Sequence, residues 1–454
     1  MGSEAIVEML DLDVTGVAHG GWCVARDGGG RVVFVRHALP GERVRARVTE
    51  ATASFARAEA VEVLRASPDR VAPRCPHARP GGCGGCDWQH ADLAAQRRLK
   101  AEVVRDQLRR LAGLDREVTV EPVAGDDDGL GWRTRVRFSV GPGGTAGLLA
   151  HRSHDVVEVG DCPIAHPLVQ AREVTGRNWA PARSVEVVVS PAAGERALIV
   201  APAPPGGAAG AARSGLGGEA DTVLVAGRGG RLTTLSGRGS LRQHAAGRSW
   251  RVSAAAFWQV HPGAADALSA AVLDVLRPRP GEVALDLFCG AGLFAGALAP
   301  VVGPGGSVAG VEADAAAVRD ARHNLRPWPW ARVHKGDVAM VLRRGGQPGA
   351  GPGALRAARL VVADPPRSGL AREVVEYLGA AENGALRFAY VSCDPATLAR
   401  DIGLLIARGW SLADLRAFDA FPMTHHVECV ATLVRNSDQV AGCAGDPASV
   451  VPVT

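Results

Sequence analysis

The carboxyl-terminal half of the chain alternates short apolar segments with helix-like segments, and this alternation limits the possible folds more than any other feature. The apolar segments are residues 283–287, 307–311, 360–363 and 387–391. Each is short and almost continuously apolar, which is typical of strands buried on both faces of a sheet. The sequence after Val252 therefore predicts a mostly parallel sheet covered by helices, an α/β architecture.

The region before residue 65 has a different pattern. The β-rich runs Val32–Val35 and Val44–Val48 alternate with turn signals such as Gly20-Gly21 and Pro40-Gly41, which predicts a small β-barrel. Residues 91–111 predict a helix with Asp92 as its cap and an apolar stripe on one face. The opposite face is basic, with Arg97, Arg98, Lys100, Arg105, Arg109 and Arg110.

The stretch from residue 118 to 252 is mostly strand-like, and its Pro/Gly/Ala-rich run 201–219 predicts an exposed, mobile loop. Because 454 residues exceed what one core usually organises, we expect several domains. The expected segments are a barrel over 1–65, a cysteine-rich segment with the basic helix over 66–110, a β-rich domain over 111–250, the α/β domain over 251–436 and a flexible tail over 437–454.

Composition excludes several classes of protein. No apolar run approaches the roughly 20 residues that a membrane-spanning helix needs, and nine unevenly spaced cysteines do not suit a secreted disulfide framework. We therefore expect a cytoplasmic protein that does not contact membranes, and a monomer as the simplest state. The net charge of +4 permits a nucleic-acid partner without requiring one.

The segment from Gly281 to Ala299 reads as a strand, a glycine loop and a helix, the pattern of a nucleotide-type site. Gly290 and Gly292 allow close approach of a ligand, and Asp286 at the strand end can contact a cationic amino group. The third glycine, Gly296, comes one place too late for a dinucleotide fingerprint, which disfavours a hydride-transfer cofactor.

Two further acids follow the next two strands. Glu312 is spaced to bind ribose hydroxyls, and Asp337 could meet an adenine amino group. Together with the glycine loop, these acids resemble the cofactor site of the class I S-adenosylmethionine methyltransferases.

The predicted reacting group is Cys393, which stands where an apolar strand meets a proline turn. Thiolate addition to carbon 6 of uracil makes carbon 5 nucleophilic, and a base must later remove the proton from carbon 5. Glu428 is the candidate base, although an acid opening a strand is often only a solvated or capping group. Asp364-Pro365-Pro366 is followed by Arg367 rather than by a base-stacking aromatic residue, which weakens an amine-methylation reading.

Several blocks closely resemble the RNA 5-methyluridine methyltransferases with an amino-terminal TRAM domain. They are Phe257–Val260, Leu285–Gly292, Asp364–Gly369, Val391–Asp401 and Phe421–Glu428. The resemblance implies Cys393 as nucleophile, Glu428 as base, and Gln259, Phe288, Glu312, Asp337 and Asp364 around S-adenosylmethionine. It also implies a Rossmann-like methyltransferase domain, an OB-like TRAM barrel and a uridine in ribosomal or transfer RNA as target. Leu293 departs from the polar residue that the family often has there.

Cys75, Cys83, Cys86 and the distant Cys162 form a further candidate site. Four thiolates suit zinc or an iron-sulfur cluster, and scattered buried thiols are the plainer alternative. The family resemblance implies a four-iron, four-sulfur cluster, although the first spacing of seven intervening residues is longer than the family's usual five.

The barrel arginines Arg36, Arg43, Arg45 and Arg47 and the alternating Arg133, Arg135 and Arg137 are candidate contacts to RNA phosphates. Two other functions remain open. One is an S-adenosylmethionine-dependent N-methyltransferase acting on an amine, which needs no cysteine. The other is a non-catalytic RNA-binding protein that has kept a degenerate methyltransferase fold.

Overall fold

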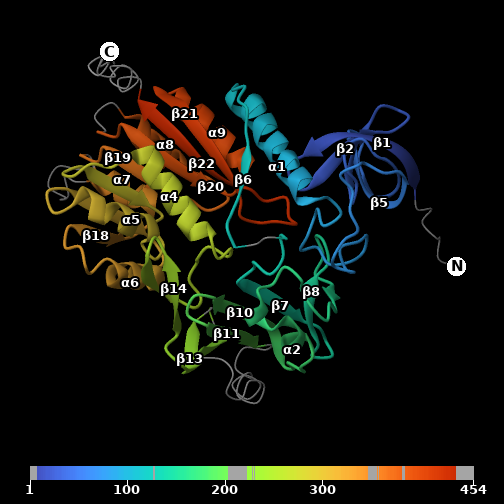
Figure 1. Cartoon of the computed structure of the whole chain (residues 1–454), viewed down its shortest axis with the longest axis horizontal. Helices are drawn as coiled ribbons and strands as arrows, with labels where there is room; N and C mark the ends of the chain where they lie inside the picture. Colours follow the sequence, from blue (N-terminus) through green and yellow to red (C-terminus); the bar gives the residue numbers. More distant parts are fainter. Residues whose placement is uncertain are drawn as a thin grey trace, which may run out of the picture. The chain divides into compact units, whose positions relative to one another are not determined.

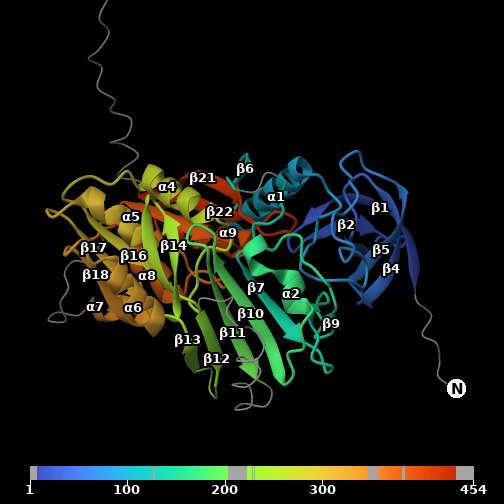
Figure 2. The same ribbon diagram turned by 60° about the horizontal axis from the view of Figure 1, so that its bottom comes forward.

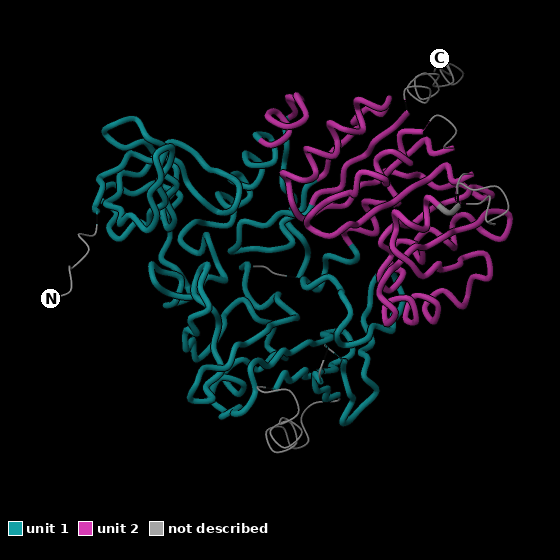
Figure 3. The backbone as a smooth tube through the Cα atoms, turned by 180° about the vertical axis from the view of Figure 1, so that it is seen from behind, with its two compact units in different colours: residues 1–106, 117–266, 417–428 teal, residues 107–116, 267–416, 429–454 magenta. Residues whose placement is uncertain are grey.

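The computed structural model describes residues 8–125, 128–202, 222–227, 229, 231–345, 355, 357–380 and 384–435. It divides into two compact units, coloured separately in Figure 3. Unit 1 comprises residues 1–106, 117–266 and 417–428, and unit 2 comprises residues 107–116, 267–416 and 429–454. The expected tail 437–454 and nearly all of the expected loop 201–219 lie outside the described residues; Ala201 and Pro202 end a strand.

The amino-terminal strands close into a barrel, as predicted. They are β1 (Met9–Ala18), β2 (Trp22–Arg26), β3 (Val32–Arg36), β4 (Arg43–Ala51) and β5 (Phe55–Arg65), in the order β1-β2-β3-β5-β4. Alternate residues such as Leu12, Val33 and Val44 are buried inside it. The turn between β1 and β2 requires Gly20 and Gly21, because both have a positive φ.

The predicted helix forms as α1 (Leu93–Gln107), followed by the π-helical turn η1 (Leu108–Ala112). Asp92 caps α1, since its Oδ1 accepts a hydrogen bond from the Ala95 N–H at 2.7 Å. The sequence predicted Lys100 on the basic face of this helix. That prediction was wrong, because Lys100 is fully buried. The reason is an ion pair between its Nζ and Asp419 Oδ1 at 2.5 Å.

Unit 1 also contains a seven-stranded sheet in the order β13-β12-β11-β10-β7-β8-β9, and its strands β13, β12, β11, β10 and β7 lie side by side in Figure 2. Its strands are β7 (Arg135–Val140), β8 (Ala146–Leu149), β9 (Val156–Val157), β10 (Ala182–Ser190), β11 (Glu195–Pro202), β12 (Thr222–Ala226) and β13 (Leu232–Ser236). A hairpin, β14 (Ser240–Ala245) and β15 (Arg248–Ser253), and two short helices, η2 (Pro167–Val169) and α2 (Ala171–Thr175), accompany it. Both faces of β10 are buried, with Val187 in one apolar cluster and Val188 in another.

The carboxyl-terminal sheet has the order β18-β17-β16-β19-β20-β22-β21-β6 (Figure 1). Its strands are β16 (Val283–Leu287), β17 (Ser307–Glu312), β18 (Ala331–Lys335), β19 (Leu360–Ala363), β20 (Arg387–Ser392), β21 (Trp410–Asp419), β22 (Glu428–Arg435) and the short β6 (Val120–Pro122), which pairs with residues 417–419. The helices are α4 (Ala264–Leu276), α5 (Leu293–Val302), α6 (Ala315–Asn324), α7 (Val338–Gly345), α8 (Arg372–Gly379) and α9 (Pro395–Ile406).

Strands β16 to β20 pair in parallel, as predicted, and β22 runs antiparallel to β20. Within the parallel part of this sheet, β16 is the first strand in the sequence. The next strands, β17 and β18, lie on one side of β16, and β19 then lies on its other side. The strand order therefore reverses beside β16. In open α/β sheets, ligands bind at the carboxyl ends of the strands that flank such a reversal.

Candidate active site

The end of β16 carries the glycine loop at this reversal point. Phe288 has a φ of 62°, Gly290 a φ of 52° and Gly292 a φ of 92°. Three positive φ values within five residues make a tight turn that L side chains rarely adopt. A Cβ atom at Gly292 would lie at an ordinary contact distance of 3.4 Å from Ala321 of α6, so the positive φ, rather than crowding, favours glycine there. The loop thus brings backbone, rather than side chains, to the carboxyl end of β16.

Three carboxylates gather around this loop in unit 2. Asp286 is fully buried, and its Oδ2 accepts a hydrogen bond from the Ala295 N–H at 2.7 Å. Glu312 binds the loop itself, because its Oε2 accepts from the Gly290 N–H at 3.0 Å. Asp364 follows β19, the other neighbour of β16, and its N–H donates to Leu287 O at 3.3 Å.

The electrostatics of these acids favour a cationic ligand. Burial raises the pKa of Asp286 well above its usual value, and the charges of Asp364 and Glu312 raise it further. Burial also raises the pKa of Asp364 to about 7. The second oxygen of Asp286, Oδ1, is buried without a hydrogen-bond partner among the described residues. A positive group bearing N–H donors would satisfy that oxygen and stabilise the ionised carboxylates.

The remaining predicted cofactor residues lie at other positions. Asp337 is exposed just beyond β18 and its Oδ1 accepts a hydrogen bond from the Met340 N–H at 3.0 Å, close to the start of α7. Gln259 is a buried residue of unit 1. Leu293 is the first residue of α5 and is buried.

Cys393 stands directly between β20 and α9. Asp394 caps α9, because its Oδ1 accepts a hydrogen bond from the Thr397 N–H at 2.8 Å. The side chain of Cys393 is partly exposed, whereas Cys289 and Cys429 are buried. Buried cysteines usually serve as small packing residues, and these two cannot reach a substrate without disturbing the core.

An acid that the sequence analysis did not single out organises the loop after Asp364. Asp401 Oδ2 accepts hydrogen bonds from the Leu370 N–H and the Tyr390 hydroxyl, both at 2.7 Å. Its Oδ1 accepts from Arg400 Nε at 2.8 Å, and Arg400 Nη2 donates to Ser368 O at 2.9 Å. Asp401 is fully buried. It therefore ties α9 and β20 to the loop that follows β19.

Glu428 is the first residue of β22 and is only 2% exposed. The ladder between β20 and β22 ends with Ser392 opposite Cys429. In the chain, Cys393 directly follows the first of these residues and Glu428 directly precedes the second. The strand register thus brings the two predicted reacting positions to the same end of one strand pair.

The four predicted cysteine ligands, Cys75, Cys83, Cys86 and Cys162, all line one small cavity of unit 1. Two N–H donors point at the sulfurs: Gly85 N lies 3.4 Å from Cys83 Sγ and Gln89 Nε2 lies 3.3 Å from Cys86 Sγ. Among the described residues no group of three or more potential ligands is arranged to hold a single metal ion. Four thiols that line one cavity are the kind of donor set that zinc or an iron-sulfur cluster uses.

Burial raises the pKa of the Cys83 and Cys86 thiols, and it raises the pKa of Cys162 to about 11. These thiols are therefore neutral unless a bound cation stabilises their thiolates.

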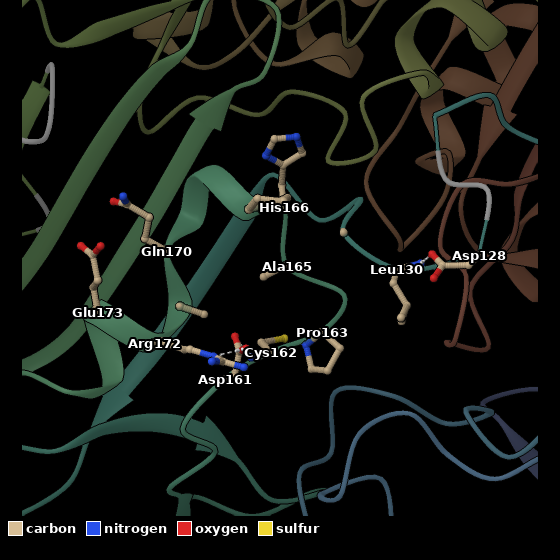
Figure 4. A pocket seen from close by; sticks show the side chains of 13 residues that line it. Asp128, Leu130, Asp161, Cys162, Pro163, Ala165, His166, Gln170, Arg172 and Glu173 are labelled. Carbon is tan, nitrogen blue, oxygen red and sulfur yellow. Dashed lines mark hydrogen bonds and ion pairs between the residues drawn. The ribbon is translucent and has the colours of Figure 1, made fainter.

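An open cavity of about 530 Å³ shares Asp161, Cys162 and Pro163 with the four-cysteine cavity. Figure 4 shows Arg172 directed toward Asp161, and its Nε lies 2.7 Å from Asp161 Oδ2. No sequence motif indicated this cavity, because the residues that line it are common loop and helix-end residues.

The predicted phosphate contacts are only partly available. Arg36 is buried and pairs with Asp87, so its expected role was wrong. Arg45 pairs with Asp11 and Glu62 at the surface. Arg135 and Arg137 both pair with Glu186, and Arg137 remains 66% exposed. Partners of opposite charge reduce the attraction of such arginines for RNA phosphates.

The comparisons with known proteins agree with this architecture. The TRAM domain family matches residues 5–61, and the tRNA (Uracil-5-)-methyltransferase family matches residues 356–436. An uncharacterized RNA methyltransferase of Streptomyces avermitilis is 47% identical over 94% of this chain and 98% of its own length. A 23S rRNA (uracil(1939)-C(5))-methyltransferase of Alkalilimnicola ehrlichii is 35% identical over 95% of this chain and 97% of its own length.

A solved structure has the same fold. The tRNA (uracil-54, C5)-methyltransferase of Pyrococcus abyssi, in complex with S-adenosyl-L-homocysteine, superposes with a TM-score of 0.69 at 22% identity and covers 93% of this chain and 100% of that one. Fold and site together define a class I methyltransferase joined to an amino-terminal TRAM barrel. The chain belongs to the RNA uracil-5-methyltransferase family. None of the helices in the described part of the chain has the length and the hydrophobicity that a membrane span requires.

Proposed function

We propose that this protein transfers a methyl group from S-adenosylmethionine to carbon 5 of a uridine in ribosomal or transfer RNA, through a covalent bond to Cys393. Family membership supports the reaction type, and the relative from Alkalilimnicola ehrlichii carries this activity in its name. The observation that carries the covalent route is the accessible Cys393 at the carboxyl end of β20, beside the strand end that bears Glu428. We expect the protein to act as a monomer in the cytoplasm.

The reaction begins with the Cys393 thiolate. Its sulfur adds to carbon 6 of the uracil ring, and the electron pair of the carbon 5–carbon 6 double bond moves toward the carbonyl at carbon 4. Carbon 5 of the resulting enolate then attacks the methyl carbon of the donor, the bond from that carbon to the sulfonium sulfur breaks, and S-adenosylhomocysteine leaves as a neutral thioether. Because carbon 6 is shielded in stacked RNA, the target uridine must leave its stack before Cys393 can reach it.

Glu428 acts only after methyl transfer. Carbon 5 then carries both a hydrogen and the new methyl group, and the Glu428 carboxylate removes that proton. The electron pair left on carbon 5 restores the double bond and expels the thiolate, so the product and the free enzyme form together. Glu428 is buried at the start of β22, at the strand end that the register places beside Cys393.

The three acids at the reversal point would hold the methyl donor. Its ammonium can donate to the unpartnered Oδ1 of Asp286, and Glu312 is placed on the next strand, where the ribose of a bound nucleoside lies in folds of this type. Phe288, Gly290, Gly292, Asp337 and Gln259 complete the proposed binding set around the three acids Asp286, Glu312 and Asp364. The donor would carry the methyl group on a positively charged sulfonium sulfur, which leaves as a neutral thioether without further activation.

We further propose that Cys75, Cys83, Cys86 and Cys162 bind a four-iron, four-sulfur cluster. Their common cavity and the two N–H donors to sulfur support this assignment. Uridine methylation transfers no electrons, so the cluster would serve structure by joining residue 162 to residues 75–86. The segment boundaries expected from the sequence also remain our proposal.

The decisive experiment uses an RNA substrate that carries 5-fluorouridine at the target. Fluorine cannot be removed as a proton is, so the covalent adduct should persist and migrate as a protein–RNA complex in a denaturing gel. Cys393→Ala should abolish the adduct, whereas Cys429→Ala, which alters the buried cysteine paired with Ser392 in the strand ladder, should keep it. An adduct that survives in Cys393→Ala would refute the assignment.

A further inference from the structure

The turn of residues 420–427, which joins β21 to β22 and ends immediately before Glu428, is held in an unusual backbone conformation. Met423 has a φ of 67°, which is uncommon for a residue other than glycine. A non-glycine residue keeps such a conformation only when its surroundings supply compensating contacts. Met423 is buried, so those contacts come from other parts of unit 1.

Two segments supply contacts to Met423. The N–H groups of Asp87 and Trp88 both donate to Met423 O, at 2.9 and 3.0 Å. On the other side, the buried Gln96 of α1 accepts from the Met423 N–H at 2.8 Å and donates to Trp88 O at 3.1 Å. Both backbone groups of Met423 are therefore satisfied by partners more than 300 residues earlier in the chain.

The side chain of Asp87 holds the next part of the turn. Its Oδ2 accepts from the His425 N–H at 3.1 Å and lies 2.6 Å from His425 Nδ1. Its Oδ1 accepts from Arg36 Nη2 of the barrel at 3.2 Å. Asp87 is 7% exposed, and a Cβ atom on Gly21 would lie 2.9 Å from its Cγ. The carboxylate thus has little freedom to move.

We propose that Asp87 is a positioning residue for the base Glu428, which it orients through His425 and the 420–427 turn. This inference rests on the proposed function of Glu428. Two residues separate His425 from Glu428, so a shift of the turn must alter where β22 begins. Asp87 also directly follows Cys86, so the four-cysteine segment is continuous with the group that orients the base.

The proposal has a specific kinetic consequence, because the base is needed only for the last step. If Glu428 is misplaced, Cys393 can still add to carbon 6 and carbon 5 can still take the methyl group. Removal of the carbon 5 proton becomes slow, and the methylated adduct persists on ordinary uridine RNA. A general structural defect would instead lower adduct formation and turnover together.

The test compares Asp87→Asn with three other variants on uridine-containing RNA and radiolabelled methyl donor. His425→Ala removes the other half of the contact at a partly exposed position and is therefore a second, less disruptive probe. Glu428→Gln defines the behaviour expected when the base is lost. Asp69→Asn is the matched control, because Asp69 lies in the same region but pairs only at the surface, with Arg98. Denaturing gels measure labelled adduct, and product RNA measures turnover.

We expect Asp87→Asn and His425→Ala to lower turnover at least tenfold while the fraction of enzyme trapped as labelled adduct rises toward that of Glu428→Gln. Asp69→Asn should match the unaltered protein. Parallel loss of adduct and turnover in His425→Ala, with its folding intact by circular dichroism, would overturn the inference, as would unchanged values for both. If the unaltered protein forms no adduct even with 5-fluorouridine RNA, the proposed function fails instead, and the two failures are distinguishable.

Discussion

Binding of the methyl donor should depend on pH through the buried acids beside the glycine loop. Burial raises the pKa of Asp364 from 3.8 to about 7, and the pKa of Asp286 is raised in the same direction. A raised carboxyl pKa means that the folded protein without ligand holds an extra proton below that pH. A shift of about three units corresponds to roughly 4 kcal/mol between the two protonation states.

A cationic donor favours the ionised carboxylates, so its binding must expel the extra proton. Affinity should therefore rise with pH by up to about tenfold per unit between pH 5.5 and 7 and level off above that range, since each expelled proton contributes a factor of ten per unit. Without ligand, the same groups stabilise the fold most at acid pH, and that stability should be lost as pH rises from about 4 through 7. The donor should consequently protect the protein more at pH 8 than at pH 5.

Isothermal titration calorimetry at several pH values, in buffers with different ionisation enthalpies, measures both the affinity and the number of protons released. Asp364→Asn removes one titrating group and should flatten the pH dependence. Asp414→Asn, at an exposed position on β21, should leave it unchanged. Equal dissociation constants at pH 5.5 and 7.5, with no proton release, would refute the reasoning.

Two other predictions concern unit 1. Lys100→Met leaves the buried Asp419 carboxylate without its ion-pair partner, which should lower the free energy of unfolding by about 3–5 kcal/mol and the thermal midpoint by roughly 6–20 °C. Arg98→Met, which breaks an exposed pair with Asp69, should cost less than about 1 kcal/mol. A similar loss of stability in both variants would contradict the argument from burial. Protein purified without oxygen should contain about four irons and four sulfides per chain by chemical analysis. Cys162→Ala should lose most of that iron, whereas Cys23→Ala, which alters a buried barrel thiol, should keep it; one zinc per chain would count against the cluster.

Local patterns in the sequence predicted much of the fold. The strands that became β16, β17, β19 and β20 were visible as short apolar runs, because strands buried on both faces need apolar residues throughout. The Asp92 cap was predictable for a similar reason, since a helix start needs an acceptor within a few residues. The barrel followed from alternating β-rich runs and glycine turns.

Contacts between distant residues left no such signal. Lys100 was placed on an exposed basic face because its neighbours in sequence are arginines, and its partner Asp419 is 319 residues away. Arg36 was assigned to RNA for the same reason, although Asp87 neutralises it. The roles of Asp401 and Asp87 were missed because each acts through residues that only the folded chain brings near.

The distance along the chain between Asp87 and His425 affects how the protein matures. Asp87 leaves the ribosome 338 residues before His425, roughly 17–70 s earlier at ordinary rates of synthesis. During that interval Asp87, Gln96 and Lys100 lack the partners that residues 419–425 provide in the finished fold. The barrel can close at once, because all five of its strands are already present. A nascent chain cut short before residue 419 would keep the barrel but expose an unfinished region to chaperones and proteases.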